Sequence, residues 1–124
     1  GLSDVEWVAQ IIQMNNGYRY PALRTTRTLK ALRAAVADDI ISENDAQALI
    51  DSWTLVTRVR NTVMLVKGRP SDVVPKDPME LSRIAQSMGY GPRAGQLLMD
   101  DYLRTTRRAR SVVMRLFYGQ PADN

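Results

Sequence analysis

Hydrophobic residues recur along the chain at intervals of three and four positions, the spacing of one face of an α-helix. No segment shows the alternation of apolar and polar residues that is typical of a strand. The pattern predicts five helices, over residues 4–14, 26–37, 42–66, 77–88 and 92–118. Two of them are long, at roughly 24 to 27 residues or 36 to 40 Å. We therefore expect an all-α fold, an elongated bundle of about five helices.

Local signals mark the ends of these helices and the limits of the domain. The segment from Ser42 to Asp45 fits a capping box, in which side chains satisfy the free backbone N–H groups at a helix start. Gly119 is the expected stop of the last helix. We expect residues 1–119 to form a single helical-bundle domain and residues 120–124 to form a flexible tail.

Apolar stripes on the two long helices predict which faces are buried. In the last helix the stripe alternates by four and three, as in a helix that packs along a neighbour: Leu98, Tyr102, Thr105, Ala109, Val112 and Leu116. The stripe of the third predicted helix consists of Ala46, Leu49, Ile50, Trp53, Val56, Val63 and Met64.

Arg60 lies within this second stripe, between Val56 and Val63. A buried guanidinium without a partner would be very costly, so the position predicts a structural buried ion pair. The candidate carboxylates are Asp4, Glu6, Asp100 and Asp101. A role in signalling between domains is the alternative interpretation.

The composition excludes several kinds of chemistry. The 124 residues include no cysteine and no histidine, which removes disulfides, thiol catalysis and the commonest general base and transition-metal ligand. The chain contains no phosphate-binding glycine loop and no serine nucleophile motif. We expect no catalytic residue, no metal site and no cofactor in the chain itself. No apolar run is long enough to cross a bilayer, and a cytoplasmic protein is the expectation.

The net charge of +4 is concentrated in residues 92–118, which contain six arginines and two aspartates. On a helical wheel Arg104, Arg108 and Arg115 share one flank beside the apolar seam. They are candidates for partner binding. The alternatives are a solvated face with intramolecular ion pairs and direct contact with a nucleotide. Nucleic-acid recognition would need base-stacking aromatic residues or a known motif, so no specific nucleic acid is expected.

Asp4 and Glu6 open the first predicted helix. Glu6 completes a capping box with Ser3, and both carboxylates favour the positive end of the helix dipole. Side chains two positions apart on a helix point about 200° from each other, so the pair cannot easily share one metal ion. Asp4 has more freedom to face a ligand or a neighbouring domain. Both residues are candidates for a domain junction.

The opening segment, GLSDVEWVAQ, resembles a motif of bacterial glutamine-synthetase adenylyltransferase/deadenylylase, in which Asp-Ile/Val-Glu-Phe/Trp-x-x-Gln follows a glycine pair and two further residues. The likeness extends through TRTLKALRAAVADDIIS, SWTLVTRVRNTVMLVKGRPSDVVP, ELSRIAQSMGY and DYLRTTRRARSVVMRLFYG. The chain departs from the family in having one glycine at its start. It also has Asn61 to Met64 where many relatives carry His-Arg-Leu-Gln.

The resemblance implies that this chain is the C-terminal helical bundle of the adenylyltransferase half, excised from a larger enzyme. The family's catalytic signature, Gly-Ser followed by Asp-x-Asp, is absent from the sequence. The fragment alone is therefore expected to be non-catalytic, with ATP and Mg²⁺ implied for the parent enzyme.

By the same resemblance, the parent transfers AMP from ATP to a tyrosine of glutamine synthetase and removes it by phosphorolysis, in the regulation of nitrogen metabolism. The implied partners are an upstream nucleotidyltransferase domain of the same chain, glutamine synthetase and the PII signal protein. Two alternatives are a bundle of a related PII uridylyltransferase and a free-standing basic adaptor or nucleic-acid-binding module.

Overall fold

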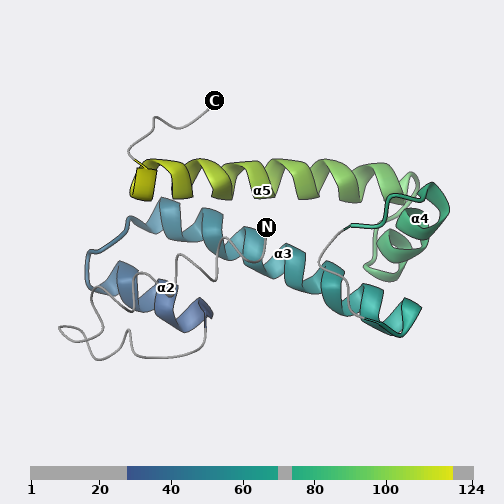
Figure 1. Ribbon diagram of the computed structural model, residues 1–124, viewed down its shortest axis with the longest axis horizontal. Helices are drawn as coiled ribbons and strands as arrows, with labels where there is room; N and C mark the ends of the chain where they lie inside the picture. The colour runs from purple at the N-terminus through teal and green to yellow at the C-terminus, as the bar shows by residue number, and fades with distance from the viewer. Residues whose placement is uncertain (1–27, 70–73, 119–124) are drawn as a thin grey trace.

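A computed structural model describes residues 28–69 and 74–118 (Figure 1). These residues form four helices and no strand, which confirms the all-α class. The helices are α2 (Thr28–Ala37), α3 (Glu43–Lys67), α4 (Pro78–Ser87) and α5 (Ala94–Tyr118). The helix predicted over residues 4–14, the stop at Gly119 and the tail lie outside the described residues.

The two long helices, α3 and α5, form the frame of the molecule. They run antiparallel, with the start of α3 beside the end of α5 (Figure 1). The short helix α2 lies against the first half of α3. At the other end of the frame, α4 lies between the second half of α3 and the start of α5.

Both ends of α3 are capped. The hydroxyl of Ser42 accepts a hydrogen bond from the backbone N–H of Asp45 at 3.1 Å, as the capping box predicted. Gly68 ends α3 in the left-handed conformation, with φ of 76°, and its N–H donates to the Met64 carbonyl at 2.9 Å. A residue other than glycine is strained at this positive φ angle, so the glycine at position 68 favours the end of the helix there.

Two hydrophobic clusters follow one another along the frame. The first joins α2, the start of α3 and the end of α5 and includes Leu32, Leu49 and Val112. The second joins the end of α3, α4 and the start of α5 and includes Ile84 and Leu98. The predicted seam of α5 is confirmed, because all six of its residues are buried or partly buried.

The prediction that Arg60 is buried is wrong, because Arg60 is exposed. The buried face of α3 runs through Leu49, Ser52, Val56, Val59 and Val63, which alternate by three and four. This alternation averages 3.5 residues, as expected for two helices that stay in contact over their length. Val59 therefore takes the core position that the sequence pattern assigned to Arg60.

Met64 is a second departure from the predicted stripe of α3. It lies one residue beyond Val63 and is exposed to solvent. Ser52, which the apolar pattern passed over, lies fully in the core instead. The buried face is therefore rotated slightly from the one that the hydrophobic residues alone indicated.

Candidate partner-binding surface

The three arginines proposed for partner binding all form ion pairs within the bundle. Arg108 lies 3.6 Å from Asp51, and Arg115 pairs with Asp45. Both contacts cross from α5 to α3. Arg104 pairs with Asp101, one turn before it on α5, at 2.5 Å. The structure thus shows the intramolecular ion pairs that the sequence left open as one alternative.

These pairs are at the surface and hold the frame only weakly. All three guanidinium groups are exposed, and exposed ion pairs contribute about 0–1 kcal/mol each. Each arginine on this flank of α5 nevertheless faces a carboxylate, which offsets part of its positive charge. Partner binding by Arg104, Arg108 and Arg115 stays a prediction.

A polar cluster ties the end of α4 to both long helices. The hydroxyl of Tyr90 donates to Asp101 at 2.7 Å, and the guanidinium of Arg58 donates to the Met88 carbonyl at 3.1 Å. Burial and the adjacent Asp101 carboxylate raise the pKa of Tyr90 to about 12. The hydrogen bond from Tyr90, with help from Arg104, lowers the pKa of Asp101.

This cluster has a structural role in the described part of the bundle. Tyr90 remains protonated and Asp101 remains ionised at neutral pH, so neither group is suited to exchange protons with a substrate there. Asp101, considered above as a partner of Arg60, is bonded to Tyr90 and Arg104.

Two other arginines of α5, Arg107 and Arg110, are exposed and have no carboxylate within 4.0 Å in residues 28–69 and 74–118. At about 100° per residue, Arg107 lies opposite the buried seam, and Arg110 lies on the flank away from Arg104, Arg108 and Arg115. The sequence placed Arg104, Arg108 and Arg115 on one flank of the helix, but it did not show which arginines of α5 would face a carboxylate.

The far end of α3 carries an exposed apolar surface, which we call the apolar end. Leu65 is 86% exposed and Met79, at the start of α4, is 73% exposed. Met64 and Val66 are also exposed. Successive side chains on a helix point about 100° apart, so three apolar residues in a row cannot all face one core.

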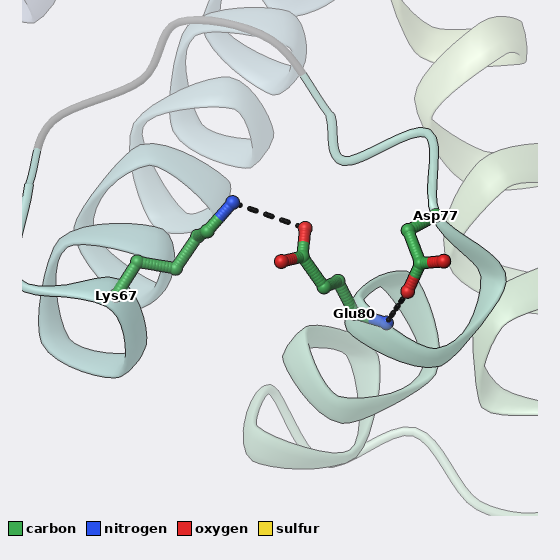
Figure 2. Close-up of polar contacts among 3 residues, drawn as sticks. All are labelled: Lys67, Asp77 and Glu80. Carbon is green, nitrogen blue, oxygen red and sulfur yellow. Dashed lines mark hydrogen bonds and ion pairs between the residues drawn. The ribbon is translucent and has the colours of Figure 1, made fainter.

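A salt bridge holds the two helices together beside the apolar end. The ammonium group of Lys67 lies 3.0 Å from Glu80, and the backbone N–H of Glu80 donates to Asp77 at 3.0 Å (Figure 2). Asp77 is the N-cap of α4. The cap defines where α4 begins, and the salt bridge adds a surface contact between that start and the last turn of α3.

Other site chemistry is limited in the described residues. Residues 28–69 and 74–118 contain no group of three or more His, Cys, Asp or Glu side chains that could hold a metal ion. None of the helices in these ranges is long and apolar enough to span a membrane. The domain-junction candidates Asp4 and Glu6 lie outside the described residues and stay predictions.

The described helices define an all-α bundle domain with exposed cationic and apolar surfaces. The chain belongs to the GlnD PII-uridylyltransferase family, whose model matches residues 1–117.

Among curated proteins, the chain is similar to bifunctional glutamine synthetase adenylyltransferase/adenylyl-removing enzymes. The protein from Streptomyces avermitilis is 51% identical over 119 residues, or 96% of this chain and 12% of the relative. That from Cutibacterium acnes is 49% identical over 120 residues, or 97% of this chain and 12% of the relative. That from Mycolicibacterium smegmatis is 40% identical over 119 residues. The chain therefore spans about 12% of the length of these relatives. No solved structure matches the chain.

Proposed function

We propose that this chain is a non-catalytic helical domain of a bifunctional glutamine synthetase adenylyltransferase/adenylyl-removing enzyme. The observation that carries the proposal is the identity of about half of all residues, over nearly the whole chain, with proteins of that name. The matching family model bears the name of a PII uridylyltransferase. The named relatives favour adenylyl transfer to glutamine synthetase over uridylyl transfer to PII.

In this proposal the chain follows a nucleotidyltransferase domain, at the C-terminal side of the adenylyltransferase half. That neighbouring domain binds ATP and Mg²⁺ and transfers AMP to a glutamine synthetase tyrosine in the cytoplasm. The chain itself lacks Gly-Ser and Asp-x-Asp, the motif residues expected to bind these groups. PII is an expected partner of the whole enzyme through the resemblance alone.

The bundle's contribution is to brace the catalytic domain through the apolar end. An exposed leucine and methionine at one end of a rigid helical pair are the kind of surface that a permanent interface within one protein buries. The α3–α5 frame and the Lys67–Glu80 salt bridge hold this surface in a fixed position.

The test is the substitution Leu65→Ser in the intact, longer enzyme. Leu65 is 86% exposed, so the change leaves the core of the bundle intact. We expect AMP transfer from ATP to glutamine synthetase to fall by about tenfold or more, the effect of ~1.4 kcal/mol. Leu97→Ser is the matched control, because Leu97 is an exposed leucine of α5. Equal activity of the two variants would refute the bracing role.

An activity assay on the same enzyme preparation distinguishes an adenylyltransferase from a uridylyltransferase. The preparation is incubated with ATP and glutamine synthetase and, separately, with UTP and PII. AMP on glutamine synthetase supports the proposal. Transfer of UMP to PII, with no modification of glutamine synthetase, would show that the chain is part of a PII uridylyltransferase.

A further inference from the structure

The outer side of α5 combines unpaired positive charge with apolar side chains. Taking about 100° per residue, Arg107 lies opposite Leu98, which is fully buried in the core. Leu103, Arg107, Arg110 and Met114 follow one another at intervals of four, three and four, so they form one continuous row on the helix. We call this row the outer stripe.

The arginines of the outer stripe differ from the other arginines of α5 because they form no ion pair within the described bundle. Arg104, Arg108 and Arg115 each lie within 4.0 Å of a carboxylate of the bundle. Arg107 and Arg110 keep their full charge, because no carboxylate of the described chain comes within 4.0 Å of them. Leu103 is an exposed leucine in the same row.

We propose that the outer stripe docks an acidic patch on glutamine synthetase, the protein that the proposed function makes the substrate. This inference rests on the proposed function and names the surface that recognises the substrate. Arg107 and Arg110 pair with carboxylates of that patch, while Leu103 and Met114 cover apolar side chains on either side of them. The docking site is thus the row beside the ion-paired arginines, rather than those arginines themselves.

The composition of the outer stripe favours a protein over a nucleic acid. Arginine and methionine are enriched where proteins bind one another. Single-stranded nucleic acid is held by aromatic side chains on which bases stack, and the row contains no aromatic residue.

The charge of the outer stripe favours a separate, exchanging partner over a permanent neighbour. Exposed opposite charges speed up diffusional encounter and add specificity, which suits a substrate that must bind and leave in every turnover. The apolar end, in contrast, has the surface chemistry of a lasting contact. The two surfaces therefore serve two different partners.

The experiment compares two double charge reversals in the intact, longer enzyme. Arg107→Glu with Arg110→Glu reverses the outer stripe. Lys30→Glu with Arg33→Glu is the matched control, because these two exposed cations are also three residues apart, on α2. The rate of AMP transfer is measured against the concentration of glutamine synthetase, at two salt concentrations, with thermal unfolding as the check on folding.

We expect the outer-stripe reversal to raise the KM for glutamine synthetase about tenfold or more and to leave kcat within about twofold, because docking is lost and the chemistry is not. The control should leave both constants unchanged. The KM of the unaltered enzyme should rise with salt, and that of the outer-stripe variant should rise less.

Three results would overturn the inference. An unchanged KM in a folded outer-stripe variant removes the docking role, while AMP transfer by the unaltered enzyme leaves the proposed function standing. Absence of AMP transfer by the unaltered enzyme refutes the proposed function itself. Tight binding of mixed-sequence duplex DNA that the reversal abolishes, with unchanged KM, assigns the stripe to nucleic acid.

Discussion

Ser52 is fully buried in the middle of α3, and its hydroxyl has no hydrogen-bond partner among the described residues. A buried hydroxyl left without a partner costs about 1–3 kcal/mol, because it gives up its bonds to water on folding. Replacing Ser52 by alanine removes that cost. We therefore predict that Ser52→Ala stabilises the protein, although the residue lies in the core.

The expected gain follows from three contributions. Removing the unpaired hydroxyl contributes at least ~1 kcal/mol, and alanine adds up to ~0.5 kcal/mol through its higher helix propensity. The lost dispersion contacts of one oxygen atom, each worth ~0.1–0.2 kcal/mol, offset part of this. The net gain is about 1–2 kcal/mol, which corresponds to a rise in Tm of about 4–8 °C in a chain of this size.

Urea unfolding is the assay, followed by circular dichroism at the helix signal. The midpoint should rise with an unchanged slope, since the surface exposed on unfolding stays the same. Ser87→Ala is the control: Ser87 is an exposed helical serine whose hydroxyl donates to the Arg83 carbonyl at 3.0 Å. It should change stability by no more than ~0.5 kcal/mol. A lower midpoint for Ser52→Ala would show instead that the hydroxyl is hydrogen-bonded in the folded protein.

Three further substitutions test the exposure of Arg60, the packing of Leu98 and the Tyr90–Asp101 hydrogen bond by urea unfolding. Arg60→Ala should lower the free energy of unfolding by less than ~1 kcal/mol, because Arg60 is exposed. A decrease of ~3–5 kcal/mol would instead support the buried ion pair that the sequence predicted. Leu98→Ala should cost ~2–5 kcal/mol, since Leu98 is fully buried in the second cluster, and a loss below ~1 kcal/mol would contradict that packing. Tyr90→Phe should cost about 1–2 kcal/mol at pH 7 through the lost hydrogen bond to Asp101. The folded pKa of Asp101 lies below its ordinary 3.8, so this difference is complete above that pH and should shrink as the pH falls through the folded pKa. A difference that stays constant down to acid pH would contradict the contact.

The helix boundaries could be predicted from the sequence because they depend on neighbouring residues. Ser42 and Gly68 act within one turn of the chain, through a side-chain cap and a left-handed backbone angle. The predicted limits of α3 therefore lie close to the observed ones. The predicted start of α5 was two residues early, because the chain makes a turn before Ala94.

The buried face of α3 was harder to predict because it depends on contacts across the whole frame. Val59 and Arg60 are neighbours in sequence and both lie near the apolar stripe. The continuous contact with α5 selects the repeat of three and four that contains Val59. A small polar residue such as Ser52 can occupy such a position because its volume fits between two long helices.

The arginines of α5 show the same division between local and long-range information. Arg108 and Arg115 lie beside the seam, and this position brings them within reach of Asp51 and Asp45 on the antiparallel partner. Their pairing depends on the register of α3 against α5, which no local pattern contains. Once that register is known, Arg107 and Arg110 are identified as the arginines of α5 that have no carboxylate within 4.0 Å in the described residues.

The most direct test of the central claim measures the transfer of labelled AMP from ATP to glutamine synthetase by three proteins. These are the intact longer enzyme, the same enzyme lacking this chain, and this chain alone. We expect AMP transfer by the intact enzyme, strongly reduced transfer without the chain, and none by the chain alone. Full activity of the enzyme that lacks the chain would show that the bundle does not support catalysis, and AMP transfer by the chain alone would show that the chain is itself catalytic.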